Sequence, residues 1–345
     1  MYLRLILYVL LSAILTGGVR QYALRRRILA LPNERSSHTI PTPRGGGLGF
    51  VVLFLLLMWR SPVDHRTLVA LCGGVLVATV GWIDDRVSLS AWIRALAHAF
   101  AAAWALYWLG GLPSVEIGLF RIPLGVLGWP IGILGIVWLI NLYNFMDGID
   151  GLAAGQAVIA SAVGGALLYV SGLPGLGELA WALAALVMGF LMWNWAPAKI
   201  FMGDVASGFL GYTFAVLSIS SEQQGGPPIL LWALLLGVFV VDATATLLRR
   251  IRQGEKWYEA HRSHAYQLAT QLGYSHAYVS GAALIISVGL GLLGWLAWSA
   301  PGYMIAIVTV GFGVLAVIWR AIVTKGLRLQ SPSKSAGGAT ITTRQ

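Results

Sequence analysis

One polar stretch closes a long apolar run near the middle of the chain, Asn141-Leu-Tyr-Asn-Phe-Met-Asp-Gly-Ile-Asp-Gly151. Its polar side chains recur at every third position, at Asn141, Asn144, Asp147 and Asp150. If the stretch is helical, that spacing puts all four side chains along one side. Carboxylates at the end of a membrane helix are costly, so we interpret the stretch as a functional site rather than a helix stop. Asn and Asp oxygens suit a hard cation such as Mg²⁺, which completes its shell with water and phosphate.

The composition places the chain in a lipid bilayer. Of its 345 residues 58% are hydrophobic and only 10% are charged, whereas soluble domains carry about 25% charged residues. The single cysteine, Cys72, excludes a disulfide framework and is interpreted as a packing residue. The net charge of +10 does not indicate nucleic acid as a partner, because the basic residues gather in short segments between apolar runs.

The apolar runs predict an all-α, polytopic membrane bundle. A spanning helix needs roughly 17–25 mostly apolar residues. Eleven runs approach this length, near 2–19, 45–59, 67–83, 88–109, 127–143, 151–171, 178–193, 205–222, 228–248, 277–298 and 302–323. The first run lacks basic residues ahead of it and a small-residue cleavage site behind it, so we expect an uncleaved span and not a signal peptide.

The charges predict the orientation of the bundle. Threading the eleven spans alternately leaves all but four of the 23 lysines and arginines on one side, the exceptions being Arg4, Arg60, Arg66 and Arg121. By the positive-inside rule that side is the cytoplasm, which puts the N-terminus outside and the C-terminus inside. We expect one membrane domain over residues 1–325 and a disordered cytoplasmic tail over residues 326–345.

Further carboxylates fall on the expected inner side. Asp84 and Asp85 are adjacent, so they repel, and one should stay protonated or share a cation. They are candidates for metal binding or for a general base, although a solvated loop balanced by Arg86 explains them equally well. Asp204 opens a span directly after Gly203, where it serves either as a ligand-facing carboxylate or as a helix N-cap. The other acidic clusters on this side favour the site.

Two cationic side chains on the inner side are candidates for binding phosphate. Arg44 lies in Pro41-Thr-Pro-Arg-Gly-Gly-Gly47, where the glycines let the backbone approach an anion, although the loop's arginines also suit the anionic leaflet. Lys199 follows a helix break at Pro197 and offers a point charge to a phosphate.

The last long inner loop ends in His261-Arg-Ser-His264. Two histidines at this spacing can bind zinc, but no acidic third ligand stands beside them, and histidine next to arginine suits a diphosphate or sugar. An interfacial basic loop is the plain alternative. Asp242 lies within the ninth span, and we expect it to face the bundle interior, toward a partner such as Arg249, without a chemical role. The outer segment 110–128 alternates polar and apolar residues and predicts a short hairpin or irregular loop.

The chain resembles the polyprenyl-phosphate N-acetylhexosamine-1-phosphate transferases of glycosyltransferase family 4. Four sequence elements carry the resemblance, and they occur in the same order as in that family. They are Pro41–Gly47, the Asp84-Asp85 pair, Asn141 to Ala153, and Phe201-Met-Gly-Asp204. Peptidoglycan members of this family carry three consecutive histidines where this chain has His261-Arg-Ser-His264. That departure argues against a muramoyl-pentapeptide substrate and resembles the branch that initiates lipopolysaccharide O-antigen chains.

The resemblance implies transfer of a sugar 1-phosphate from a UDP-N-acetylhexosamine to undecaprenyl phosphate, with release of UMP. The reaction would take place among membrane lipids at the cytoplasmic face of a bacterial inner membrane. Phosphoryl transfer needs mostly positioning and charge neutralisation, here by Mg²⁺, for which Mn²⁺ can substitute. By the same resemblance, Asp204 binds the metal with help from Asn144. Direct attack by the lipid phosphate is favoured over a covalent aspartyl intermediate.

The resemblance also assigns roles to the remaining candidates. Asp84 or Asp85 would orient or deprotonate the lipid phosphate, and Asp147 and Asp150 would shape the nucleotide end or the metal shell. Side chains expected to bind substrate are Arg44, Asn141, Lys199, His261, Arg262 and His264.

The main competing hypothesis is a secondary transporter of a nucleotide sugar or other anion. Transporters put polar residues near the membrane midplane in broken helices and often contain repeats. Here the acidic clusters gather at one face and no repeat is evident, so the enzyme is favoured. A scaffold without activity is disfavoured by the intact set of acidic residues. The sequence leaves the oligomeric state open, with a homodimer as one candidate.

Overall fold

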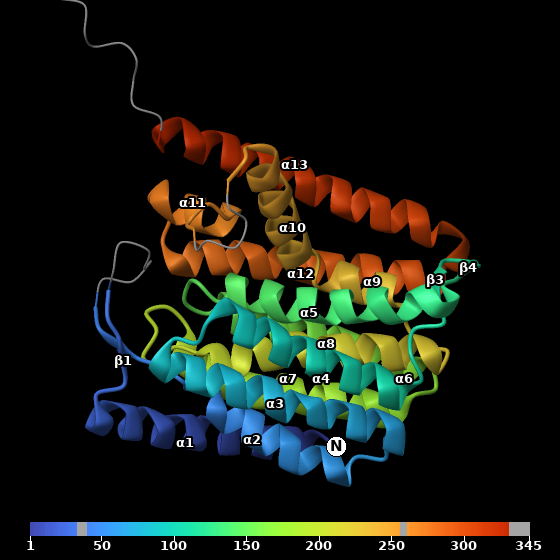
Figure 1. Cartoon of the computed structure of the whole chain (residues 1–345), viewed down its shortest axis with the longest axis horizontal. Helices are drawn as coiled ribbons and strands as arrows, with labels where there is room; N and C mark the ends of the chain where they lie inside the picture. The colour runs from blue at the N-terminus through green and yellow to red at the C-terminus, as the bar shows by residue number, and fades with distance from the viewer. Residues whose placement is uncertain (33–39, 256–260, 331–345) are drawn as a thin grey trace, which may run out of the picture.

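The computed structural model describes residues 1–32, 40–255 and 261–330, and most of them are helical (Figure 1). The helices of these ranges are α1 (Tyr2–Arg26), α2 (Leu48–Leu57), α3 (His65–Val87), α4 (Ala91–Leu109), α5 (Gly128–Met146), α6 (Leu152–Val170), α7 (Pro174–Asn194), α8 (Asp204–Gln223), α9 (Ile229–Leu235), α10 (Gly237–Arg252), α11 (Ala265–Gln271), α12 (His276–Ser299) and α13 (Met304–Gln330). The expected all-α architecture is therefore confirmed.

Among the described residues, seven helices are long and apolar enough to cross a membrane, and α9 with α10 makes an eighth if a bent pair counts as one span. Each of the eleven expected runs coincides with helix. Three of these helices, α2, α4 and α8, are not among the candidate spans. The polytopic membrane class thus agrees with the sequence, while the count of eleven spans and the orientation stay predictions.

The outer helices expose apolar side chains that water would not tolerate in such number. Leu3 on α1 is 80% exposed, Ile285 on α12 is 75% exposed and Val317 on α13 is 70% exposed. Large contiguous apolar surfaces are rare on soluble monomers, whereas a bilayer solvates them. The exposed faces of α1, α12 and α13 therefore suit contact with lipid tails.

Helix α8 occupies the centre of the bundle. Nearly its whole length is buried, and it packs against α3 and α5. It carries Ser, Thr and Glu side chains that would be costly next to lipid but are tolerated where protein groups surround them. This burial explains why α8 crosses the bundle without the apolar composition of a lipid-facing span.

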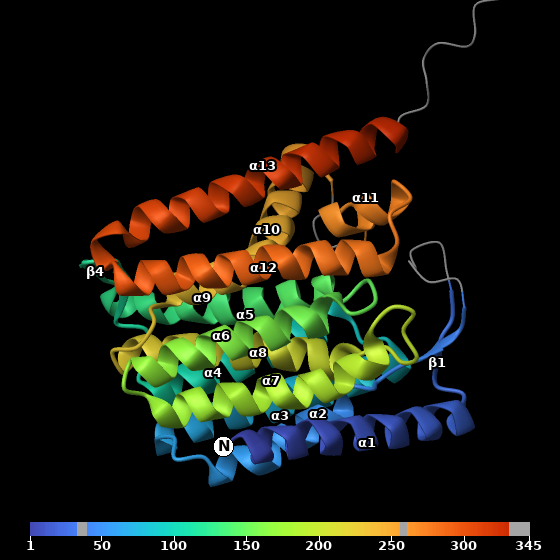
Figure 2. The same ribbon diagram turned by 180° about the vertical axis from the view of Figure 1, so that it is seen from behind.

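Two small antiparallel sheets mark the two ends of the bundle. Strands β1 (Leu29–Ala30) and β2 (Thr42–Pro43) pair at one end, and β3 (Ser114–Ile117) and β4 (Phe120–Pro123) pair at the other. Figures 1 and 2 show β1, α11 and the C-terminal end of α13 together at the first end, called here the β1 end. The opposite end is called the hairpin end, and its β3–β4 hairpin confirms the hairpin expected within 110–128.

Two of the expected spans differ from the helices in the structure. The ninth span is not straight, because α9 and α10 meet at 87° just before Gly237, and α10 then leans toward α13 (Figure 1). The last helix continues to Gln330, so its last five residues, 326–330, fall in the segment expected to be a disordered tail. Residues 331–345, which make up the rest of that tail, lie outside the described residues.

Candidate active site

Arg44 joins two carboxylates that are far apart in the sequence. Its Nε lies 2.7 Å from Oδ1 of Asp85, and its Nη2 lies 2.7 Å from Oδ1 of Asp204. Arg44 directly follows strand β2, Asp85 lies in the last turn of α3, and Asp204 is the first residue of α8. The Asp85 side chain is 3% exposed, whereas the Asp204 side chain is 22% exposed. Of the two carboxylates, Asp204 is thus the one that a ligand can reach.

Asp85 also holds the start of α8. Its two oxygens accept the backbone N–H groups of Asp204 at 3.0 Å and of Val205 at 3.3 Å. These N–H groups have no partner within their own helix, so the carboxylate satisfies them and interacts favourably with the helix dipole. The helix N-cap is Gly203, which has no side chain. The alternative role of Asp204 as an N-cap is therefore wrong, and its carboxylate is free to face Arg44.

Two glycines permit this close approach of α3 and α8. A Cβ atom on Gly81 would lie 2.2 Å from the carbonyl oxygen of Asp204. Gly203 has a φ of +81°, and a Cβ there would lie 2.6 Å from Oδ2 of Asp85. Contacts this short force the backbone apart, so a side chain at either position would separate the two carboxylates.

Asp84 turns to a different cation. It accepts a hydrogen bond from Arg94 Nη1 at 2.8 Å and another from the backbone N–H of Leu89 at 2.6 Å. The expected partner Arg86 instead donates to the Trp82 carbonyl at 2.8 Å and stacks 3.6 Å from the centroid of the Trp82 ring. The hypothesis that Arg86 balances Asp84 and Asp85 is wrong, because Arg44 and Arg94 do so.

The end of α5 brings two more polar side chains to Asp204. Asn144 Nδ2 donates to Ser207 Oγ at 3.0 Å, and the Asn144 and Asp84 side chains both lie within hydrogen-bonding reach of Asp204. Asp147 is the C-cap of α5, and no hydrogen bond reaches its carboxylate from the described residues. Burial, followed by the nearby charge of Asp204, raises the pKa of Asp147 well above its usual value.

We call these four carboxylates and two guanidinium groups the acidic cluster; its members are Asp84, Asp85, Asp147, Asp204, Arg44 and Arg94. Fully ionised, the acidic cluster carries two negative charges more than positive ones. Burial lowers the pKa of Arg44, but the charges of Asp204 and Asp85 outweigh that effect and raise the pKa. The guanidinium therefore stays charged, and a further cation would still be attracted to the cluster.

Asp150 lies apart from the other polar residues of its stretch. Its Oδ2 accepts the backbone N–H of Ala198 at 3.0 Å, and its Oδ1 lies 3.4 Å from Nδ1 of His276. We expected four side chains on one helix face, but α5 ends at Met146. Only Asn141 and Asn144 lie on this helix, and Asp147 and Asp150 follow it. Beyond that point the chain turns, and Gly151 has a φ of +75°.

Comparison with known proteins matches the sequence over most of its length. The family Glycosyl transferase family 4 matches residues 67–222. The decaprenyl-phosphate N-acetylglucosaminephosphotransferase of Mycobacterium tuberculosis is 30% identical over 330 residues, which cover 83% of this chain and 78% of that protein. This chain belongs to the polyprenyl-phosphate hexosamine-1-phosphate transferases of glycosyltransferase family 4.

Two further relatives of this family 4 transferase come from other bacteria. A probable undecaprenyl-phosphate N-acetylglucosaminyl 1-phosphate transferase of Bacillus subtilis is 29% identical, with 76% of this chain and 75% of that protein covered. An undecaprenyl-phosphate alpha-N-acetylglucosaminyl 1-phosphate transferase of Yersinia pestis is also 29% identical, with 79% and 78% covered. The family resemblance drawn from the sequence is confirmed.

The family match begins after Arg44 and ends before His261–His264, the segment called here the histidine loop. Within the matched region lie Asp84, Asp85, Asn144 and Asp204. Folding of the transferase adds Arg44 to this group, as the ion pairs show.

Two predicted substrate-binding residues have other neighbours in the transferase. Asn141 lies one turn before Asn144 on α5 and donates from Nδ2 to the Val137 carbonyl at 2.7 Å. Lys199 is exposed, and its Nζ lies 5.7 Å from the centroid of the Trp193 ring. Neither side chain contacts a carboxylate of the acidic cluster within the described residues, so their binding roles stay predictions.

The histidine loop packs beside the end of α5. The rings of His261 and His264 lie 4.8 Å apart, and His264 is buried against Phe145 at 6.4 Å between ring centroids. Burial, followed by the charge of His264, lowers the pKa of His261 to about 3, which leaves its imidazole neutral at pH 7. Arg262 accepts a hydrogen bond at its carbonyl from Gln271 Nε2 at 3.1 Å.

Several partners of the predicted residues escaped the sequence analysis. Arg94 binds Asp84, Ser207 binds Asn144 and His276 lies beside Asp150. An arginine inside the apolar run 88–109 was a signal, because intramembrane charges face a partner. Nothing in the sequence distinguishes Ser207 or His276 from other polar residues near helix ends.

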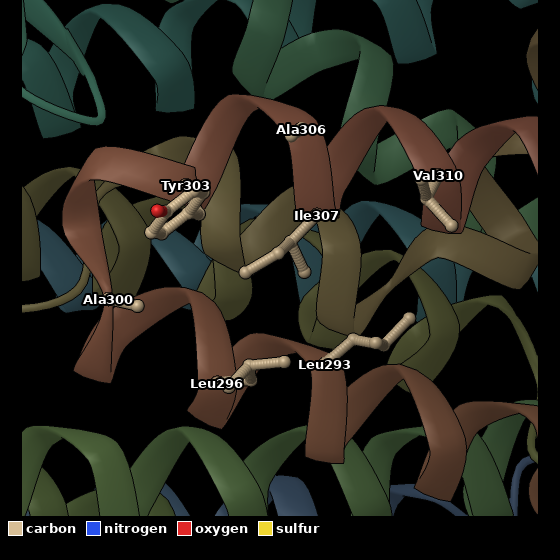
Figure 3. Close-up of a pocket in the computed structure, with 7 residues that line it drawn as sticks. All are labelled: Leu293, Leu296, Ala300, Tyr303, Ala306, Ile307 and Val310. Atoms are coloured by element: carbon tan, nitrogen blue, oxygen red, sulfur yellow. The ribbon is translucent and has the colours of Figure 1, made fainter.

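An apolar cavity in the structure lies apart from the acidic cluster. It is an apolar groove of about 390 Å³ between α12 and α13 (Figure 3), and its lining includes Leu293, Leu296, Ile307 and Val310. It lies near the turn between these two helices, and that turn contacts Gly118 of the hairpin end. Its lining carries no charged side chain, and the hydroxyl of Tyr303 is the one polar side-chain group among the lining residues.

Proposed function

We propose that this chain transfers N-acetylhexosamine 1-phosphate from a UDP-sugar to undecaprenyl phosphate and releases UMP. The observation that carries the proposal is the Arg44 bridge between Asp85 and Asp204, which gathers charge at one end of the bundle. The relatives' names support it, since each names a polyprenyl phosphate and an N-acetylglucosamine phosphate group. They also make UDP-N-acetylglucosamine the first donor to test.

The reaction requires two anions to meet. An oxygen of the lipid phosphate attacks the β-phosphorus of the UDP-sugar, the bond from that phosphorus to the bridging oxygen breaks, and UMP leaves with this oxygen. Such transfers need little covalent help from the protein and depend on positioning and charge neutralisation. Arg44 is placed to contribute one of those charges, because its guanidinium already lies at the partly exposed Asp204.

The donor set of the cluster fits a divalent cation. A bound divalent cation would favour the ionised form of all four carboxylates and would balance their excess of two negative charges over Arg44 and Arg94. Asp204 with Asn144 supplies oxygen ligands at the accessible side. Within the described ranges, no group of three or more His, Cys, Asp or Glu side chains is arranged to hold a metal ion by itself. Mg²⁺ keeps several waters and binds substrate phosphates, so an open set suits it, and Mn²⁺ can substitute. When bound, the metal neutralises charge on the diphosphate.

The remaining carboxylates would hold the parts of the site in place. Asp85 orients Arg44 and the first N–H groups of α8, and Arg94 fixes Asp84 beside Asp204. A lipid phosphate is already ionised at neutral pH, so it needs little help from a base. We therefore favour direct attack by the lipid phosphate over a covalent aspartyl intermediate.

The β1 end would face the cytoplasm of a bacterial inner membrane. Soluble UDP-sugar is available there, and the basic helix ends of α1 and α10 suit an anionic inner leaflet. The product would be the first lipid-linked sugar of O-antigen or a related cell-envelope polysaccharide.

The test is UMP release by the purified protein with undecaprenyl phosphate, Mg²⁺ and a set of UDP-N-acetylhexosamines. We expect release with one donor, and none when the lipid phosphate is omitted. A protein that binds UDP-sugar but releases no UMP with any donor would contradict the proposal and favour a transporter.

A further inference from the structure

Asp242 is a buried carboxylate outside the acidic cluster. It lies on α10, is 5% exposed, and accepts the backbone N–H groups of Ala265 at 2.8 Å and of Tyr266 at 3.2 Å. Thr246 Oγ1 donates to the same carboxylate at 3.1 Å, and His264 Nδ1 lies 3.5 Å away. Asp242 faces the interior as expected, but its hydrogen-bond partners are Thr246 and the first two residues of α11, and not Arg249.

This carboxylate binds the start of α11, beside the capping box that His264 forms with Gln267. Burying a carboxylate is costly unless hydrogen bonds compensate it, and bonds from N–H to a charged acceptor are among the stronger ones. Each oxygen accepts one of the first two N–H groups of α11, which have no acceptor inside that helix. Loss of either bond would leave a buried donor unpaired and release the start of the helix.

The 87° bend between α9 and α10 makes this contact possible. A straight ninth span would stay within the bundle, whereas α10 turns away at Gly237 and packs against α11, α12 and α13. Asp242 lies in the second turn after the bend. Because of the bend, the Asp242 side chain lies beside α11 and the histidine loop.

From α11 the contacts continue to the acidic cluster. Tyr266 Oη donates to the carbonyl oxygen of Phe145 at 2.9 Å, two residues before Asp147. A Cβ atom on Gly148 would lie 2.0 Å from that Tyr266 oxygen, so the phenol fits closely against the turn after α5. The His264 ring stacks on Tyr266 at 5.8 Å between centroids. A connected series of contacts thus joins Asp242 to the turn that carries Asp147.

We propose that Asp242 is a positioning residue, which holds the His261–His264 segment against the acidic cluster through the start of α11 and through Tyr266. The inference rests on the proposed function and on the sequence-based expectation that His261, Arg262 and His264 bind the diphosphate or sugar of the UDP-sugar. Asp242 itself touches neither substrate. Its role is to fix the distance between the donor-binding loop and the carboxylates.

The first variant is Asp242→Asn, which keeps the size of the side chain but turns one acceptor oxygen into a donor. The amide group then opposes an N–H of α11. Since a displacement of about 1 Å can cost roughly 100-fold in rate, we expect kcat/KM for the UDP-sugar to fall about 10- to 100-fold. The loss should appear mainly as a higher KM for the UDP-sugar, with the KM for undecaprenyl phosphate unchanged.

The matched control is Glu222→Gln. Glu222 is a buried carboxylate at the hairpin end, and it also accepts two backbone N–H groups, from Glu116 at 2.9 Å and from Ile229 at 2.7 Å. Its replacement by glutamine disrupts the same kind of hydrogen bond, from a backbone N–H to a buried carboxylate, but at a site far from the histidine loop. We expect a lower melting temperature and an unchanged KM for the UDP-sugar. An equal rise of KM in both variants would make the effect of Asp242 a general loss of stability and overturn the proposal.

A second pair of variants covers the case in which Asp242→Asn does not fold. Tyr266→Phe removes the bond to Phe145 without touching the buried carboxylate, and it should raise the same KM by a smaller factor. Asp242→Glu keeps the charge and should recover part of the wild-type KM. A wild-type KM for the UDP-sugar in Tyr266→Phe would overturn the proposed connection.

Hydrogen exchange of the full-length protein separates this inference from the proposed function. We expect the amides of residues 265–268 to exchange faster in Asp242→Asn than in the wild type, and at the wild-type rate in Glu222→Gln. Unchanged exchange in Asp242→Asn refutes the positioning role. If the wild type releases no UMP, the proposed function fails, while the exchange result still decides whether Asp242 holds the loop.

Discussion

The two ends of the bundle use the same residue types for different purposes. At the hairpin end, Asp64 accepts the backbone N–H of Thr67 at 3.0 Å, and Glu222 accepts two backbone N–H groups. At the β1 end, Asp85 and Asp204 share Arg44, and Asp147 receives no hydrogen bond from the described residues. Carboxylates at both ends complete backbone hydrogen bonds, but at the β1 end Asp84, Asp85, Asp147 and Asp204 also gather around Arg44 and Arg94.

The hairpin end forms a closed polar network. Gln224 Nε2 donates to Asp64 at 3.0 Å and to Ser220 at 2.7 Å, and Ser220 and Thr67 hydroxyls lie 2.5 Å apart. Each of these carboxylates has its partners within the protein, so no ligand is needed to balance it. The difference teaches that several carboxylates gathered around shared arginines, and not the mere presence of carboxylates at a helix end, mark the end of the molecule where we propose the reaction.

The largest expected effect is that of metal removal. Chelation by EDTA should abolish UMP release, because the excess negative charge of the acidic cluster would then repel the diphosphate, and added Mg²⁺ or Mn²⁺ should restore it. Melting curves recorded with and without EDTA show whether the protein stays folded. Turnover that continues in EDTA would remove the metal from the mechanism. The acidic cluster at the β1 end would then need no ligand to balance its charge, like the carboxylates of the hairpin end.

Asp204→Asn should come next, with UMP release reduced by roughly 10³-fold, since one charged group at the reacting phosphates is lost. The variant stays nearly isosteric, and Asp85 still binds the first N–H groups of α8. We therefore expect a melting temperature close to that of the wild type. Wild-type turnover in this variant would refute the assignment of Asp204.

Arg44→Lys should lower turnover by roughly 100-fold, less than Asp204→Asn does. Lysine keeps the charge but cannot contact Asp85 and Asp204 with two separate nitrogens, as the planar guanidinium does. Rates and metal dependence are measured under the same conditions. Full activity would show that only the charge matters and that the bridge has no catalytic importance.

Glu222→Gln should have the smallest effect on turnover and a clear effect on stability. Leaving one buried backbone N–H unpaired costs about 1–3 kcal/mol, so the apparent melting temperature should fall. UMP release at a temperature well below the transition should equal that of the wild type. Lost turnover in a folded Glu222→Gln protein would contradict the division of the two ends into a structural and a functional one.

Much of the helical layout follows from the sequence. Apolar runs of membrane length predict helices, and observed helices lie at all eleven expected positions. The bend after α9 was not predicted, because the run 228–248 was interpreted as one span and the break depends on how α10 packs against α12 and α13. Asp150 was grouped with Asn144 on spacing alone, and the turn after Met146 separates them.

The sequence by itself determined which side chains could carry charge and which end of each helix they occupy, because helix length and residue spacing are local properties. It therefore placed Asp85, Asn144 and Asp204 at the same end. Only the tertiary structure decided that Arg44 lies between Asp85 and Asp204, 160 residues away from the latter. Pairing over such a distance depends on how α3 and α8 cross at Gly81 and Gly203, and close packing of backbones is a property of the whole fold.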